Sequence, residues 1–384
     1  MDSFLDQIIE VSDFRVDLLE IPFNSPVHLP FGLINSRPSV WLTVKASVNG
    51  VLTKGAAEGT ALPMQIPMYD DYSGNLKENI EKILHSLKDR SLIMREIPDI
   101  IDSIDIGGNF ATARMTVESS IMDAAARSTN KSIVSYLDNN PSDAIRRIPY
   151  GKSIAEQDKN NMMIAAENAI KRGAKRIKFK LSPSNYENLY LVLSDLVVKY
   201  PNIDFMVDAN GMFDPGNKEH IAILQSIDSL NLLTIEEPVS RVGTTSGLDA
   251  YRMLASAINF STPITIDDAI KTLSDAYKAL DEGIADIVNL KPGRMGSFIK
   301  CLNIADYAKS HNKEVMVGGM FEATPGRMMT LSLATYCMRL GFEVPGDVSL
   351  PQERLGSDIV ERSLYLDEDY NVVFKPKLGW GYAI

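Results

Sequence analysis

The chain has 384 residues, 45% of them hydrophobic and 23% charged, which is enough apolar area for one large domain or two. This composition excludes a fibrous repeat protein and a chain that is mainly disordered. Lysine and arginine number 39 against 50 acidic residues, a formal net charge of −11, so nucleic acid and anionic membrane surfaces are not expected partners.

The N-terminal segment, residues 1–143, is predicted to form an α+β domain. Apolar and polar residues alternate over residues 41–46, and Asn-Gly at 49–50 supplies a turn, which together indicate a β-hairpin. Two stretches with several prolines or glycines, residues 22–32 and 55–64, are interpreted either as lids or as irregular packing.

The sequence carries no sign of export or membrane insertion. Its first residues lack the basic start, apolar run and cleavage site of a secretory signal, and no run is long enough to span a membrane. Cys301 and Cys337 have no metal-like spacing and are interpreted as buried thiols. We therefore expect a cytoplasmic protein.

Short β-rich runs alternate with amphipathic stretches through residues 144–344, which is the pattern of a parallel sheet with crossover helices. Seven strands are predicted, at residues 148–154, 176–181, 203–208, 232–236, 264–267, 286–290 and 314–317. Six helices are predicted beside them, at residues 158–172, 186–200, 218–229, 272–282, 298–310 and 327–339.

Seven or eight such units favour a closed (β/α) barrel over an open doubly wound sheet. A Rossmann-type sheet would carry G-x-G-x-x-G after its first strand, and the turn at residues 150–153 contains no such motif. In a barrel, the active site lies at the carboxyl ends of the strands. Residues 345–384 lose the repeat and are predicted to return to the N-terminal domain.

A carboxylate ends each of three successive predicted strands: Asp208, Glu236 and Asp267. A single acidic residue in this position usually caps the next helix, but three in succession would meet at the catalytic end of a barrel. Neighbouring strands are about 4.8 Å apart, so the three side chains can converge, and their combined charge requires a cation. Ligands that are all oxygen favour Mg²⁺ first and Mn²⁺ second.

Lysines complete this pattern. In the run I-K-F-K-L, Lys178 and Lys180 share one face of a strand and the apolar residues share the other. In isolation the run indicates a solvated face, but a strand of a parallel barrel has none, so both lysines are expected to point inward. Lys291 ends a strand across the barrel from Lys180. A lysine beside a divalent cation and other lysines is disfavoured as an ammonium ion, which makes it a usable base near neutral pH.

These residues suit the removal of a proton from the carbon next to a carboxylate. A metal ion that binds the substrate carboxylate stabilises the enediolate, while a lysine amine takes the proton. With lysines on both faces, the enediolate is reprotonated from the opposite side or loses a leaving group. Glu322, after the last predicted strand, is interpreted as a member of this site or as a helix cap.

Several short runs, in this order, resemble the muconate-lactonising branch of the enolase superfamily. They are I-K-F-K at 177–180, V-D-A-N at 207–210, I-E-E-P at 235–238, I-D-D at 266–268, N-L-K-P-G-R-M-G-S at 289–297 and G-G-M-F-E at 318–322. The last two, with P-G-D-V-S at 345–349, are most similar to o-succinylbenzoate synthases and N-succinylamino acid racemases. The resemblance covers nearly the whole barrel and, more weakly, the two ends of the chain.

The resemblance implies a (β/α)7β modified TIM barrel with an α+β capping domain. Mobile loops of that domain, here around His28, Leu29 and Leu62, would close over the substrate. The PFNSPVHLPFG run that holds His28 is longer than its usual counterpart in the family, which bears on the choice of substrate.

The resemblance also implies roles at the strand ends. Asp208, Glu236 and Asp267 would bind Mg²⁺, Lys180 would be the base, and Lys291 would be the opposing acid or base.

Four further residues would support them. Lys178 would assist electrostatically, Asn210 would order the metal shell, and Glu322 would lie beside the lysines. Asp268 stands where the synthases usually have Glu, so this acid is one methylene shorter.

The favoured function is o-succinylbenzoate synthase, which dehydrates a cyclohexadiene precursor in menaquinone synthesis, and the alternative is N-succinylamino acid racemase. Mandelate racemase-like enzymes are disfavoured because no histidine is suitably placed on the seventh strand. Dipeptide epimerases and muconate-type cycloisomerases are less favoured. A barrel that binds a carboxylate or metal without turning it over is the alternative of another class. We expect a small carboxylate substrate and a homo-oligomer.

Overall fold

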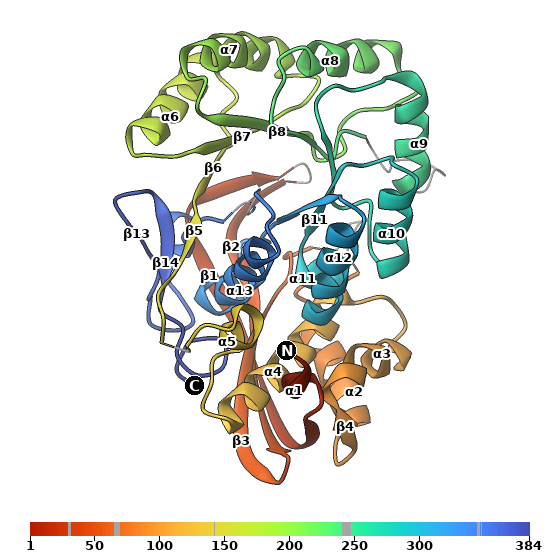
Figure 1. Cartoon of the computed structure of the whole chain (residues 1–384), viewed down its shortest axis with the longest axis vertical. Coiled ribbons are helices and arrows are strands. Elements are labelled where there is room, and N and C mark those ends of the chain that lie inside the picture. The colour runs from red at the N-terminus through yellow and green to blue at the C-terminus, as the bar shows by residue number, and fades with distance from the viewer. Residues whose placement is uncertain (30–31, 65–69, 142, 240–246, 344–345, 347) are drawn as a thin grey trace.

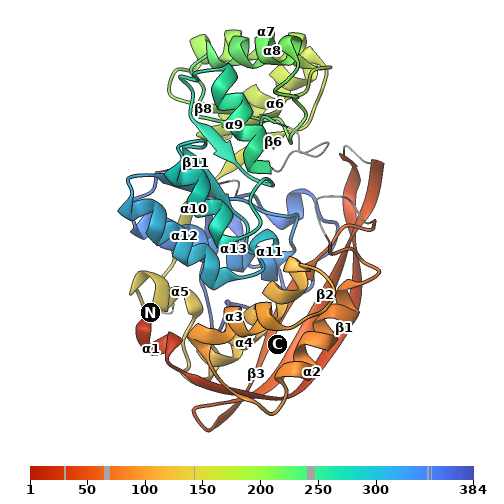
Figure 2. The same cartoon turned by 90° about the vertical axis from the view of Figure 1, so that its right-hand side faces the viewer.

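The computed structural model describes residues 1–29, 32–64, 70–141, 143–239, 247–343, 346 and 348–384. An antiparallel sheet with its helices occupies one end of the molecule, and a curled parallel sheet covered by helices occupies the other (Figure 1). The view turned by 90° shows a long hairpin of β1 (Ile8–Leu29) and β2 (Gly32–Val48) running along one edge toward the parallel sheet (Figure 2).

The N-terminal part contains a four-stranded antiparallel sheet in the order β3-β2-β1-β4. Residues 49–50 join β2 to β3 as predicted, and their φ angles of 48° and 84° are those of a tight hairpin turn that Asn and Gly tolerate. Helix α4 packs between β3 and a helix of the barrel, and its small residues allow that close fit. The other elements of this part are α1 (Asp2–Leu5), β3 (Val51–Thr60), α2 (Leu76–Leu87), β4 (Ser91–Ile93), η1 (Met94–Glu96), α3 (Ile97–Ser103), α4 (Ala111–Ser128) and α5 (Ile133–Asp138).

The two stretches interpreted as lids or irregular packing are mostly regular strand. Residues 22–29 belong to β1, and residues 55–60 belong to β3, whereas residues 30–31 lie outside the described part. The β1–β2 pairing shifts register between Pro22 and Val27, because prolines have no N–H to donate to the ladder. The hairpin therefore accommodates its prolines by a shift in pairing instead of by ending.

Seven parallel strands form the curled sheet in sequential order from β6 to β12, which confirms the predicted barrel class. Each is short and almost wholly buried, since helices cover one side and the barrel interior the other. The strands are β6 (Gly151–Ile154), β7 (Arg176–Lys180), β8 (Asp204–Asp208), β9 (Ile235–Glu236), β10 (Ile264–Ile266), β11 (Ile287–Leu290) and β12 (Glu314–Val317).

The segment around Val348 fills the eighth position of the ring. The Gly151 N–H on β6 donates to the Val348 carbonyl at 3.4 Å. On the other side, Gly346 lies so close to β12 that a Cβ there would come within 1.9 Å of the Val317 carbonyl oxygen. This segment therefore closes the barrel between its last and first strands.

The helices around the barrel agree with the six predicted ones to within a few residues, and two more are present. Helix α9 follows residues 240–246, which lie outside the described part, and its buried Leu248, Tyr251 and Leu254 recur at helical spacing. None of the helices in the described ranges combines the length and apolar character that crossing a membrane requires. The barrel helices are α6 (Lys159–Lys171), α7 (Tyr186–Lys199), α8 (Lys218–Asp228), α9 (Gly247–Ala257), α10 (Leu273–Asp281), α11 (Pro292–Met295), α12 (Phe298–Ser310) and α13 (Thr324–Arg339).

The first predicted strand, residues 148–154, is in fact two. Strand β5 (Arg146–Pro149) pairs antiparallel with β14 (Asn371–Phe374), which also pairs with β13 (Tyr365–Leu366), and only β6 belongs to the barrel. A short 3-10 turn, η2 (Pro351–Glu353), precedes β13 in the returning tail.

The tail also reaches the N-terminal part of the chain. The Trp380 indole N–H donates to the Ser119 carbonyl on α4 at 3.0 Å, and the Trp380 backbone N–H donates to Asp123 at 2.8 Å. The position of the domain boundary between residues 344 and 345 falls outside the described residues and stays a prediction.

The interior of the barrel is layered. Met206, Ile287 and Met316 pack with Leu233 in a small apolar cluster of their own. Toward the carboxyl ends of the strands the interior becomes polar and then charged, as in other barrels that carry their site at that end. The apolar layer forms the floor of the site described next.

Candidate active site

The strand register brings the predicted residues to one level of the barrel. Lys180 on β7 pairs with Asp208 on β8, and Asp208 pairs with Glu236 on β9. Paired residues of a parallel sheet point to the same face, so these side chains and Lys178 all point inward. Phe179, between the two lysines, is buried in the main core instead.

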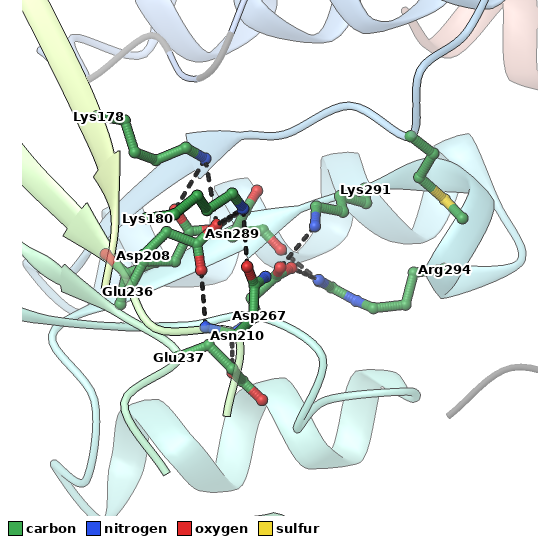
Figure 3. Close-up of polar contacts among 12 residues, drawn as sticks. Lys178, Lys180, Asp208, Asn210, Glu236, Glu237, Asp267, Asn289, Lys291 and Arg294 are labelled. Carbon is green, nitrogen blue, oxygen red and sulfur yellow. Dashed lines mark hydrogen bonds and ion pairs between the residues drawn. The ribbon is translucent and has the colours of Figure 1, made fainter. Parts of the chain in front are cut away.

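Lys178 and Lys180 occupy one flank of the carboxylates (Figure 3). Lys180 Nζ lies 2.6 Å from Asp208 Oδ2 and 2.8 Å from Asn210 Oδ1. Lys178 Nζ lies 3.1 Å from Glu236 Oε2 and 3.7 Å from Asp208 Oδ2. Since the Lys178 side chain is 7% exposed and that of Lys180 is 35% exposed, Lys180 is the one of the two that a bound molecule can reach.

Asp267 and Lys291 form the opposite flank. Asp267 Oδ2 lies 2.5 Å from Lys291 Nζ, and Arg294 donates to the other oxygen of the same carboxylate. Arg294 is buried on the short helix α11 and also donates to the Asn289 carbonyl. Figure 3 shows Lys180 and Lys291 approaching the carboxylates from different sides.

Glu236 lies between the two flanks. Its Oε1 accepts a hydrogen bond from Asn289 Nδ2 at 2.8 Å, while Oε2 faces Lys178. Burial and the negative charge of Asp208 raise the pKa of Glu236 to about 7, and Asp267 adds to the rise, against the opposing effect of Lys178. The three carboxylates are therefore close enough to repel one another.

The two outer carboxylates are shifted the other way because each has two cationic neighbours. Burial would raise the pKa of Asp267, but Lys291 and Arg294 outweigh it and lower that pKa to about 2. At Asp208, burial is likewise outweighed by Lys180 and then by Lys178, and its pKa is lowered. The flanking cations thus keep both carboxylates ionised.

The chemistry of the donors suits a divalent metal ion. Oxygen ligands from three adjacent strand ends are what Mg²⁺ prefers, and their mutual repulsion would be relieved by a cation. In this structure ammonium and guanidinium groups lie against those oxygens. No three acidic, histidine or cysteine side chains within the described ranges are arranged to hold a metal ion as they stand. The donor set fits such an ion once the lysine amines turn away from the carboxylates.

Asn210 and Asp268 lie at the edge of the cluster. Asn210 has a left-handed backbone (φ 46°), which lets its N–H donate to Asp208 Oδ1 at 3.0 Å while its side-chain oxygen accepts from Lys180. It therefore orients one carboxylate and one lysine. Asp268 is buried directly after Asp267, where β10 has ended.

Glu322 belongs to the loop that follows β12. Its Oε1 accepts the Met320 N–H at 2.8 Å, and its Oε2 lies 3.3 Å from Arg327. The part of the loop against Lys291 is Gly318, where a Cβ would come within 2.7 Å of the Lys291 Cε. The loop thus forms a wall beside Lys291, and Glu322 helps to hold its shape.

The predicted substrate loops are only partly described. His28 and Leu29 end β1 at the tip of the hairpin, and their side chains lie outside the described part of the structure. Leu62 is half-buried just after β3 and forms an isolated bridge with Tyr72. Residues 345 and 347 of the P-G-D-V-S run also lie outside it. The role of these loops in closing over a substrate stays a prediction.

Three residues of the cluster had no assigned role in the sequence analysis. Asn289 lies two residues before Lys291 on β11, so the alternation that identifies the lysine pair would also have identified it. Glu237 has a left-handed backbone (φ 41°), and its Oε2 accepts the Asp267 N–H at 2.7 Å. Arg294 lies on the short helix α11, which turns its side chain toward Asp267. No alternation or strand-end pattern in the sequence indicates that position.

Comparisons with known proteins identify the family of this chain. Residues 161–384 match the sequence model of the family described as enolase C-terminal domain-like. The chain is 28% identical over 310 residues to an o-succinylbenzoate synthase of Bacillus subtilis, covering 79% of this chain and 78% of that protein. It is 25% identical over 377 residues to an N-succinylamino acid racemase of Amycolatopsis, covering 97% and 95%. A solved enolase superfamily member from Listeria innocua has a TM-score of 0.83 at 25% identity, over 98% of this chain and 95% of that one.

Proposed function

Because this chain belongs to the enolase C-terminal domain-like family, and so to the enolase superfamily, we propose that it removes a proton from the carbon next to a carboxylate. The favoured activity is that of an o-succinylbenzoate synthase, which dehydrates a cyclohexadiene precursor in menaquinone synthesis. Similarity to synthases over most of the chain supports this choice. Racemisation of N-succinylamino acids is the second candidate, supported by the similarity to racemases of that type.

The observation that carries the proposal is the pair of lysines on opposite flanks of one carboxylate cluster. Lys180 meets Asp208 at 2.6 Å, and Lys291 meets Asp267 at 2.5 Å. An enediolate is planar, so a substrate bound between these flanks would present one face to each amine. This is the arrangement that acid-base chemistry at a single carbon requires.

The charge of the site favours an anionic substrate. Four cationic groups lie against Asp208, Glu236 and Asp267, while Glu237 and Asp268 add two carboxylates at the edge, so the site would attract an anion once a divalent ion is bound. The apolar floor closes the site below and leaves its field weakly screened. A substrate with two carboxylates, such as the synthase substrate or an N-succinylamino acid, would be attracted to it. The cationic groups are Lys178, Lys180, Lys291 and Arg294.

We propose that Asp208, Glu236 and Asp267 hold Mg²⁺, with Mn²⁺ as a substitute. When bound, the ion supplies positive charge next to the substrate carboxylate. Lys180 and Lys291, released from their carboxylate partners, turn their amines toward the substrate. Lys178 is too deeply buried to follow and remains a fixed positive charge beneath it.

Each activity assigns the lysines a different pair of steps. In the synthase, Lys180 takes the proton from the carbon next to the carboxylate and then gives it to the hydroxide that leaves on the same face, while the Lys291 ammonium stabilises the enediolate. In the racemase, one lysine takes the proton from one face and the other lysine delivers a proton to the opposite face. The same residues therefore serve both reactions.

The experiment that tests the proposal is turnover of both substrates in the presence of Mg²⁺. The synthase reaction is followed by the formation of o-succinylbenzoate and the racemase reaction by chiral chromatography. Incorporation of solvent deuterium next to the carboxylate should occur with the wild type. It should be lost in Lys180→Ala for the substrate face that Lys180 serves, and in Lys291→Ala for the opposite face. No turnover of either substrate would refute both activities, and no deuterium incorporation by the wild type would leave only a binding protein. Incorporation by both lysine variants at the wild-type rate would refute the roles assigned to the lysines.

A further inference from the structure

The first turn of α13 is held by carboxylates that come from outside the barrel. Glu58 lies on β3 of the N-terminal sheet and is 3% exposed, with its side chain directed to the start of α13. Glu58 Oε1 accepts the Ala323 N–H and Oε2 accepts the Gly326 N–H, each at 2.9 Å. Asp358 of the tail accepts the Thr324 N–H at 2.9 Å. The N–H groups that a helix start leaves without a helical partner are thus satisfied by other parts of the chain.

The turn that Glu58 holds is joined directly to the wall of the active site. Ala323 follows Glu322, and a Cβ on Gly326 would come within 2.7 Å of the Glu322 Cβ, so the Glu322 side chain lies across this turn. Glu322 in turn accepts the Met320 N–H within the loop.

The other end of that loop touches a reacting group. Gly318 lies against Lys291, where a Cβ would meet the Lys291 Cε at 2.7 Å and the Asn289 Oδ1 at 2.5 Å. Five residues of chain, from Gly318 to Glu322, therefore join the contact with Lys291 to the start of α13.

We propose that Glu58 is a positioning residue for the reaction: by holding the start of α13 it sets the loop wall against which Lys291 lies. The inference rests on the proposed function in taking Lys291 as the acid or base on one face of the substrate. It assigns a role in the chemistry to a residue of the N-terminal domain that touches neither the carboxylate cluster nor its lysines.

A second buried glutamate provides a matched control. Glu118 on α4 accepts the Phe298 and Ile299 N–H groups at the start of α12, at 2.8 and 3.0 Å, but it does so with Oε1 alone. Glutamine keeps one acceptor oxygen, so Glu118→Gln retains both contacts. Glu58→Gln cannot, because Glu58 uses both oxygens and the amide nitrogen would face a backbone N–H. Both are fully buried glutamates of the same part of the chain.

The experiment compares proton exchange on the two faces of the substrate. Wild type, Glu58→Gln and Glu118→Gln are incubated in D₂O with Mg²⁺ and with each enantiomer of an N-succinylamino acid. Burial raises the pKa of Glu58 to about 7, with a further contribution from Glu322, so the assay is run at about pH 8.5, where the carboxylate is ionised. Lys180→Ala and Lys291→Ala identify which enantiomer each lysine exchanges.

In Glu58→Gln, the exchange by Lys291 should fall about ten- to a hundredfold, while the exchange by Lys180 should stay within about twofold of wild type. Glu118→Gln should match wild type for both enantiomers. Equal losses for both enantiomers would indicate general loss of structure and overturn the inference, and so would unchanged exchange.

A readout without substrate separates this inference from the proposed function. Amide hydrogen exchange over residues 318–327 should be faster in Glu58→Gln than in wild type or Glu118→Gln. If wild type exchanges neither enantiomer and forms no o-succinylbenzoate, the proposed function fails, and unchanged amide protection in Glu58→Gln would then overturn the positioning role as well.

Discussion

The folded chain should lose stability as the pH rises from about 4 to about 8, and Glu118 should account for about 3 kcal/mol of that loss. Glu118 is fully buried between α4 and the start of α12. Burial raises the pKa of Glu118 from its ordinary value of 4.5 to about 7, and hydrogen bonds from Ser297 and Ile299 offset only part of the rise. Glu118 should therefore hold its proton in the folded chain at pH values where the unfolded chain has lost it.

The sign follows from this difference. A carboxyl group with a higher pKa in the folded chain than in the unfolded chain contributes its full stability below the unfolded value of 4.5. That contribution disappears as the pH rises through the folded value of about 7. At about 1.36 kcal/mol for each pH unit, the interval between the two values corresponds to about 3 kcal/mol.

Glu118→Gln removes the titrating group and keeps the acceptor oxygen, so it isolates this contribution. Urea unfolding of both proteins between about pH 5 and about pH 8 should show the variant gaining about 3 kcal/mol on the wild type. Tryptophan fluorescence is a suitable signal because the Trp380 ring lies 4.9 Å from that of Phe298, centroid to centroid, beside the Glu118 contact. A stability difference that did not change with pH would refute the reasoning.

Three further predictions concern the site itself. Arg294→Met leaves buried Asp267 with one cationic partner fewer, so urea unfolding should show that the free energy of unfolding falls by about 3 kcal/mol. Arg294→Lys should restore part of that loss, and equal stabilities of the wild type and Arg294→Met would contradict the prediction. Gly318→Ala places a methyl group 2.7 Å from the Lys291 Cε, so kcat should fall about tenfold or more, and an unaltered kcat would count against the wall. A chelator should abolish activity, and added Mg²⁺ or Mn²⁺ should restore it. Mg²⁺ should also raise the melting temperature of the wild type but not that of Asp208→Asn, and equal rises in the two proteins would argue against the assigned ligands.

Much of the barrel could be predicted because its pattern is local. Parallel strands covered on both sides are short apolar runs, and the helices between them repeat with helical spacing, so both signals can be read without knowing the fold. The first strand was misjudged for a reason that is not local. Residues 146–149 pair with β14, which lies more than 200 positions later in the sequence. No sequence pattern near residue 150 indicates that pairing.

The length of the β1–β2 hairpin could not be predicted because its prolines and glycines resemble those of a loop. In the structure, β1 runs through Pro22 and Pro26 as strand, but its pairing with β2 is interrupted between Pro22 and Val27 and resumes beyond. Helix α9 is a different case, since Leu248 and Leu254 carry an ordinary helical pattern that was within reach of the sequence.

At the site, the residues that could be predicted are those whose position follows from strand geometry. Asp208 and Glu236 end strands, and Lys178 and Lys180 alternate on one, so a parallel sheet alone brings them together. Arg294 and the contacts of Glu322 depend on how two turns fold back on the strand ends. The positions of these side chains depend on packing between distant parts of the chain, so no motif spacing in the sequence predicts them.

The two anchors of the α13 turn are made at very different moments of synthesis. Glu58 is available early, whereas Asp358 emerges from the ribosome only after every strand of the barrel has been translated. A nascent chain stalled between Glu322 and Asp358 would contain all the reacting groups but would lack one support for the loop beside Lys291. Competence for turnover should therefore appear late and abruptly during translation, well after the barrel itself can begin to form.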